Sequence, residues 1–198
     1  MKWVLSTFIT ACFLINPAKA QTFDWTSVNL PVQSNDWNTM PQTGRAGYAV
    51  GAAQMAAYLS QDDSHQTCVA GLYVMFLEKT NNQPRNDALV LEIDDLTKTV
   101  CGTAQAPSSS LMSSNDIVEA FSSAANKDAW FGFVLGMADY LGYRMYAVYG
   151  AEASDCVKGM TLRAVRLDTN SPASWTETPN EPFVESIIAP VLKACDLG

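Results

Sequence analysis

Five cysteines and a single histidine are the side chains of this sequence best suited to covalent or metal chemistry. A hydrolase of the Ser-His-Asp or Cys-His type would need His65, which stands in a polar segment of the kind that is usually solvated. A zinc site would need closely spaced ligands, and the sequence has no Cys-x-x-Cys pair. We therefore predict no catalytic residue, no metal site and no cofactor, and we expect the protein not to be an enzyme.

The adjacent carboxylates of Asp94 and Asp95 are a second possible source of acid–base chemistry. Neighbouring residues of a helix point in different directions, so they do not form such a pair. Apolar residues of this segment recur at spacings of four, three and four, at Leu89, Ile93, Leu96 and Val100. That stripe predicts a helix whose other side, with Glu92, faces solvent.

The first twenty residues resemble a secretory leader. Lys2 is followed by an apolar run over residues 3–15 and then by Ala18-Lys19-Ala20, the small-x-small pattern of a cleavage site. The run is shorter than the roughly 20 apolar residues of a membrane-spanning helix. We expect cleavage after Ala20 and a periplasmic or secreted mature protein that does not insert into a membrane. A lipoprotein modified at Cys12 is the alternative.

The remainder of the sequence contains an internal repeat. Four short motifs occur twice, in the same order. In the first copy they are Ser34-Asn35-Asp36, Gly47-Tyr48-Ala49-Val50-Gly51, Cys68-Val69-Ala70-Gly71, and Asn86 fifteen residues before Cys101. In the second copy they are Ser114-Asn115-Asp116, Gly132-Phe133-Val134-Leu135-Gly136, Cys156-Val157-Lys158-Gly159, and Asn180 fifteen residues before Cys195. Their shared order indicates a duplicated unit.

The repeat also bears on the cysteines. Loss of the leader leaves four, and an even number in an exported protein is typical of disulfides. Four cysteines allow three pairings. The repeat favours Cys68–Cys101 and Cys156–Cys195, because each copy then carries its own bond. Closing a loop of this length stabilises a fold by about 3 to 4 kcal/mol.

The composition is acidic, with 12 Lys and Arg against 20 Asp and Glu. Loss of Lys2 and Lys19 with the leader would take the net charge from −8 to about −10. Nucleic acids and anionic membranes bind basic surfaces, so neither is an expected partner. An acidic surface suits solubility, and it equally suits binding to a basic protein.

We predict an all-α fold of two homologous small helical units in tandem, each closed by a disulfide. The units are residues 34–102 and 113–198, with an extended lead-in over 21–33 and a linker over 103–112. Helices are expected over 45–60, 68–79, 89–100 and 130–148, a polar turn over 61–67, and a loop over 169–179. Pro190 is expected to kink or shorten the last helix.

Two glycine pairs need an explanation. Gly47 and Gly51 lie one turn apart in one expected helix, and Gly132 and Gly136 do so in another. Glycine inside a helix costs about 1 kcal/mol relative to alanine. We expect these helix-packing glycines to lie where the backbone of another helix approaches closely.

The motifs of the second copy follow one another in a suggestive order. They are Asn115-Asp116-Ile117-Val118, a Gly-x-x-x-Gly-x-x-Asp helix from Gly132 to Asp139, a Cys-x-x-Gly-x-Thr segment from Cys156, and a helix that closes at Cys195. This order resembles the Rap/Tai-type periplasmic immunity proteins of bacterial type VI secretion. The resemblance implies a helical protein that binds and blocks a cell-wall-cleaving effector. Those proteins usually have one unit, and here the first copy has Gln54 in place of the aspartate.

Non-enzymatic binding of another protein is thus the function that the sequence favours, with a cell-wall hydrolase effector as the implied partner. A structural or chaperone-like periplasmic role without a toxin partner is the alternative. Tyrosines at the end of the helix over 130–148 could anchor an interface, and acidic residues on polar faces could speed encounter. The candidate partner-binding residues are Asp62, Asp63, Asp94, Asp95, Tyr146, Tyr149, Glu152 and Asp155.

Overall fold

The computed structural model describes residues 23–25, 27–60, 63–82, 88–121, 126–166 and 180–197. Apart from an isolated bridge between Ser113 and Pro182, every regular element in these ranges is a helix, which confirms the predicted all-α class. The predicted leader and the predicted loop over 169–179 lie outside them. The helices are α2 (Ser34–Thr39), α3 (Gln42–Tyr58), α4 (Asp63–Gly71), α5 (Tyr73–Asn82), α6 (Val90–Val100), α7 (Ser114–Phe121), α8 (Lys127–Tyr149), α9 (Ala151–Arg166) and α10 (Phe183–Ala194).

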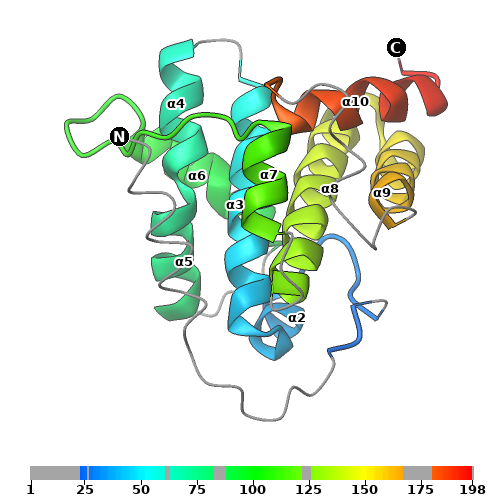
Figure 1. Cartoon of the computed structure of the whole chain (residues 1–198), viewed down its shortest axis with the longest axis horizontal. Coiled ribbons are helices and arrows are strands. Elements are labelled where there is room, and N and C mark those ends of the chain that lie inside the picture. Colours follow the sequence, from blue (N-terminus) through cyan, green and yellow to red (C-terminus); the bar gives the residue numbers. More distant parts are fainter. Residues whose placement is uncertain are drawn as a thin grey trace.

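Helices α3 and α8 form the centre of the molecule and run side by side in the same direction (Figure 1). The structure places Gly47 and Gly51 on one side of this contact and Gly132 and Gly136 on the other. A Cβ added at any of the four would collide with backbone atoms of the opposite helix. The absence of side chains is therefore what lets the two backbones approach so closely.

The other helices flank this central pair. Helices α4 and α5 pack against α3, and α9 packs along α8 and also contacts α10 (Figure 1). A short helix, a long central helix and the flanking helices thus follow one another twice along the chain. In the described part of the chain, each helix is too short or too polar to cross a lipid bilayer.

Each half of the core contains a cluster of aromatic rings. In the first half, the ring of Trp37 in α2 lies edge-on to Tyr48 of α3 and Phe76 of α5, with centroids 5.7 and 5.6 Å away. In the second half, Phe133 of α8 lies 5.3 Å from Phe121 of α7 and 6.0 Å from Phe183 of α10. Burial of such large rings contributes much of the hydrophobic free energy of folding.

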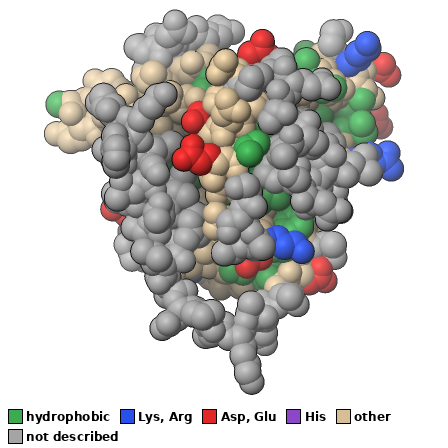
Figure 2. All heavy atoms as spheres, viewed as in Figure 1, with side chains coloured by type: hydrophobic (Ala, Val, Ile, Leu, Met, Phe, Trp, Pro, Cys, Tyr) green, Lys and Arg blue, Asp and Glu red, His purple; other side chains and the backbone are tan. Residues whose placement is uncertain are grey.

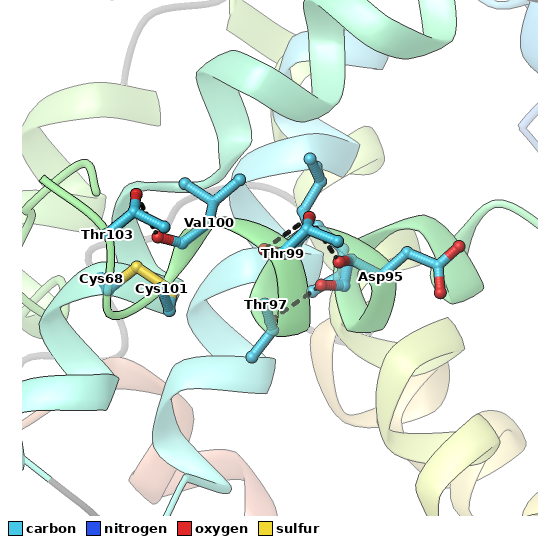
Figure 3. The surroundings of a disulfide bond; sticks show 9 residues. Cys68, Asp95, Thr97, Thr99, Val100, Cys101 and Thr103 are labelled. Atoms are coloured by element: carbon cyan, nitrogen blue, oxygen red, sulfur yellow. Dashed lines mark hydrogen bonds between the residues drawn. A yellow bond between two sulfur atoms is a disulfide. The ribbon is translucent and has the colours of Figure 1, made fainter. Parts of the chain in front are cut away.

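Two disulfides connect pairs of helices. Cys68 of α4 bonds to Cys101 at the end of α6, and Cys156 of α9 bonds to Cys195 at the end of α10, which confirms the predicted pairing. The Cα atoms are 5.7 and 6.0 Å apart, within the usual range for a disulfide. Figure 3 shows the first bond beside the last turns of α6, where three hydroxyls donate to main-chain carbonyls of this segment: Thr97 to Ile93, Thr99 to Asp95 and Thr103 to Val100.

The prediction of a polar turn over 61–67 was wrong, because α4 already begins at Asp63. The single helix expected over 68–79 is in fact two helices, which meet at Leu72. Cys68, Val69 and Leu72 are buried. Tertiary packing of these residues outweighs the polar composition of the first turn of α4.

Two further predictions concern α10 and α6. Of the two outcomes expected at Pro190, a shortened helix is not found, since α10 continues through this exposed residue to Ala194; a kink there stays a prediction. Glu92 was expected to face solvent, but it is 4% exposed and forms an ion pair with Lys79. Helix α5, which carries Lys79, packs against α6 and covers this side of it.

Candidate functional site

Helix α8 is buried along most of its length and emerges from the core in its last two turns. Tyr146, Val148 and Tyr149 are 61%, 65% and 57% exposed. Among the large hydrophobic side chains of the described residues, Leu91 of α6 is the other exposed one. The end of α8 therefore carries three exposed apolar side chains.

The acidic residues that follow lie next to this place in the chain. Helix α8 ends at Gly150, whose φ of 86° favours glycine, and the chain turns there into α9. Glu152 and Asp155 are exposed, whereas Ser154 and Val157 of the same helix are buried. We call the exposed set Tyr146, Val148, Tyr149, Glu152 and Asp155 the α8–α9 surface.

Packing and a disulfide hold the helices of the α8–α9 surface in place. Helix α9 packs along α8, and the Cys156–Cys195 bond ties α9 to the end of α10. Tyrosine on such a scaffold offers a large contact area at a small cost in side-chain entropy. Glu152 lies in the first turn of α9, where a negative charge also stabilises the helix. Exposed tyrosines are among the side chains enriched at protein–protein interfaces.

Asp94, a predicted partner-binding residue, is engaged inside the molecule. Its Oδ1 accepts a hydrogen bond from the Tyr140 hydroxyl at 2.7 Å, and its Oδ2 accepts one from the Tyr143 hydroxyl at 2.9 Å. Burial, followed by the hydrogen bond to Asp94, raises the pKa of both tyrosines. Asp94 therefore joins α6 to α8, whereas its neighbour Asp95 is exposed.

A hollow of about 190 Å³ lies beside this cluster. Its walls include Tyr143, Asp94, and the ion pair of Lys79 with Glu92. These charged groups already bind each other or tyrosine hydroxyls. None of these four side chains is therefore left unpaired in the hollow to act as a general acid or base.

The remaining predicted residues lie elsewhere. Asp62 lies outside the described residues, and so does the side chain of Asp63, although its backbone begins α4. His65 lies in α4 and is half-buried. Of the eight candidates, the structure thus brings Tyr146, Tyr149, Glu152 and Asp155 together at one helix junction.

Among the described residues on the face in Figure 2, charged side chains stand as separate spots. Attraction of a basic partner over long distances would depend on the overall negative charge of the molecule, −8 for the full sequence. The few charges beside the tyrosines would act mainly at short range.

Asp139 of α8 is a buried polar residue to which sequence reasoning gave no role. Its side chain is 0% exposed, and Oδ2 accepts hydrogen bonds from the Val32 N–H at 2.8 Å and the Tyr48 hydroxyl at 2.6 Å. Burial raises the pKa of Asp139 to about 6, against the opposing effects of these two hydrogen bonds and of nearby Lys158. A carboxylate inside an apolar helix was the signal that it needed internal partners.

Gln54 of α3 performs the corresponding task in the other half. Its Oε1 accepts a hydrogen bond from the Met112 N–H at 2.7 Å, and its Nε2 donates to the Ser110 carbonyl at 3.2 Å. Gln54 and Asp139 each fix a stretch of chain that leads into a short helix. This geometry supports a structural role for both residues: Gln54 uses its oxygen and its nitrogen in internal hydrogen bonds, and Asp139 uses Oδ2.

Comparison with family models, with characterised proteins and with solved structures found no match to this chain.

Proposed function

We propose that this chain is an exported, non-enzymatic protein that binds another protein in the periplasm. The observation that supports this most is the α8–α9 surface, where two tyrosines and a valine are more than half exposed beside two carboxylates. Exposed aromatic side chains held on a rigid element are the usual anchors of protein interfaces. The two disulfides suit a protein that works in an oxidising compartment.

The partner in this proposal is a cell-wall-degrading effector, which the protein blocks as an immunity protein. The order of motifs in the second copy supports this choice through its resemblance to the Rap/Tai-type proteins. The leader, with cleavage after Ala20, would deliver the protein to the compartment where such an effector acts. An excess of acidic residues would help it meet a basic hydrolase.

A protection assay tests the function. Bacteria would export a peptidoglycan hydrolase encoded beside this protein, and lysis would be followed by optical density. The full chain should prevent lysis, whereas a chain starting at Gln21 should not, because it stays in the cytoplasm. If the full chain protects against no hydrolase encoded beside it, the immunity role is wrong and a structural or chaperone-like role gains support.

Variants of the α8–α9 surface test the site. We expect Tyr146→Ser with Tyr149→Ser to abolish protection while leaving the melting temperature unchanged, since both side chains are mostly in solvent. Leu91→Ser is the matched control, because it also removes an exposed apolar side chain but lies on α6. Loss of protection with Leu91→Ser alone would move the binding site to α6.

A further inference from the structure

Contacts between α3 and α8 occur in reciprocal pairs. A Cβ added at Gly47 would overlap the carbonyl oxygen of Ala129, and a Cβ added at Gly132 would overlap the carbonyl oxygen of Gly44. Ala129 and Gly44 are themselves equivalent positions, because each stands three residues before the glycine of its own copy. A contact that recurs with the two partners exchanged is the property of a two-fold symmetric interface.

The next turn of each helix repeats the pattern. A Cβ at Gly51 would overlap the carbonyl oxygen of Phe133, and a Cβ at Gly136 would overlap that of Tyr48. Phe133 and Tyr48 are equivalent, since each directly follows the first glycine of its pair. The symmetry therefore extends along the contact between the two helices and is not confined to one point.

Each half also extends an arm onto the other half. The first arm precedes α2, and its Trp25 donates an indole N–H to Oδ1 of Asp128 at 2.9 Å and stacks on Phe131 at 5.8 Å. Further along this arm, the Val32 N–H binds Asp139. All three of these contacts are with residues of α8, which belongs to the second half.

The second arm precedes α7 and lies on the first half. A Cβ at Gly71 of α4 would come within 3.0 Å of Pro107, and the Ser109 N–H donates to the Thr67 carbonyl at 2.9 Å. The Met112 N–H binds Gln54 of α3. Val32 and Met112 each stand two residues before the first residue of the short helix that follows.

These two arm residues are also anchored in the same way to their own halves. The carbonyl of Val32 accepts a hydrogen bond from the Leu89 N–H at 3.1 Å, and the carbonyl of Met112 accepts one from the Phe183 N–H at 2.9 Å. Leu89 and Phe183 stand at the start of α6 and α10. Each arm residue thus connects the last helix of its own half to the central helix of the other half.

We propose that the two halves form a pseudo-symmetric pair, in which the α3–α8 contact and the exchanged arms act as a protein–protein interface. The partner that this interface fits is the other half of the chain. Residues 103–105, the part of the predicted linker that precedes the second arm, are not needed to keep the halves together. Both disulfides lie within a half, so neither of them joins the two. This pairing is independent of the proposed function.

The test is to cut the linker of the full chain. A protease recognition sequence inserted between Ala104 and Gln105, which are both exposed, allows the oxidised protein to be cleaved after it has folded. We expect the two fragments to elute from gel filtration together, at the volume of the uncut chain, and to give a one-to-one complex in native mass spectrometry. Fragments that separate under the same conditions, folded or not, would overturn the proposal.

Glycine variants of the cleavable chain show whether the α3–α8 contact holds the fragments. We expect Gly47→Ala and Gly132→Ala to weaken their association to a similar degree, because the two sites are equivalent. Gly159→Ala is the matched control, since a Cβ at this position of α9 would meet no atom within 4 Å. If all three variants weakened the association of the fragments equally, the assignment of the interface to α3 and α8 would be wrong.

Discussion

At the residue scale, Asp139 and Gln54 both hold a main-chain segment against a central helix, but the cost of burying the two side chains differs. Each accepts a main-chain hydrogen bond from the arm of the other half. The carboxylate of Asp139 must lose its hydration when it is charged, and this is the main reason why its pKa rises to about 6. The neutral amide of Gln54 has no such cost.

We predict that Asp139→Asn removes a pH dependence of stability. The pKa of Asp139 is about 6 in the folded protein and 3.8 for an ordinary solvated carboxyl group, so the folded state binds this proton more tightly. The free energy of unfolding of the wild type should therefore rise as the pH falls from about 6 toward 3.8. Above pH 6, the cost of burying the charged carboxylate should be fully present. The shift in pKa corresponds to a cost of roughly 3 kcal/mol at most. The asparagine retains an oxygen that can accept both hydrogen bonds.

Urea unfolding of wild type and Asp139→Asn across this pH range measures the effect. The variant should be at least as stable as wild type above pH 6, and its advantage should shrink as the pH falls. A difference between the two proteins that stays constant with pH would show that ionisation of Asp139 does not determine it. Gln54→Ala, which removes hydrogen bonds but no charge, serves as the control and should be destabilised equally at all these pH values.

At the scale of the elements, the contact of α3 with α8 depends on the absence of four side chains. Gly136→Leu would place its side chain against the backbone at Tyr48 and Ala52, and it should cost about 1 to 3 kcal/mol or more by overpacking. Gly159→Leu, on the open side of α9, should instead be neutral or stabilising. Thermal unfolding compares the two. An unchanged melting temperature in Gly136→Leu would mean that the helices can separate at no cost.

The disulfides act on the flanking elements. Replacing Cys156 and Cys195 together by serine should lower the free energy of unfolding by about 3 to 4 kcal/mol, because the unfolded chain regains the freedom of a long loop. Replacing Cys68 and Cys101 together should cost a similar amount, since the two loops are of similar length, 33 and 39 residues in sequence separation. Chemical denaturation of both double variants checks this. A loss confined to one of them would show that the bonds are not equivalent in stability.

At the scale of the whole molecule, the two halves differ where a partner would bind. The positions equivalent to Tyr146 and Tyr149 in the first half are Gln61 and Ser64, counted from the matching glycines. If the α8–α9 surface binds the partner, one chain should therefore bind one partner molecule. Native mass spectrometry of the purified complex would show this ratio. Two partner molecules per chain would mean that the first half carries a binding surface of its own.

The net charge of the whole molecule leads to a kinetic prediction. If the first twenty residues are removed as a leader, loss of Lys2 and Lys19 would leave a charge near −10, which should attract a basic partner over long distances. The association rate should then fall steeply as salt is added, whereas dissociation should change less. Stopped-flow measurements at increasing salt test this. An association rate that does not depend on salt would leave the acidic residues with a role in solubility alone.

Periodicity and repetition in the sequence determined much of this fold. Apolar residues at helical spacing predicted the all-α class, and the duplicated motifs predicted which cysteines pair. The glycine pairs pointed to close helix contact for a local reason, the cost of glycine inside a helix. Such features can be read from the sequence because they depend on neighbours in the chain or on comparison of one copy with the other.

Only the tertiary structure decided which polar residues lie inside. Glu92 and Asp94 lie on α6, and the sequence gives no sign that α5 covers one and the tyrosines of α8 bind the other. For Asp139 the apolar residues around it in α8 indicate burial, but they do not identify its partner Val32, which is 107 residues away in the chain. Local spacing does not show which distant element packs over a carboxylate or which group it binds there.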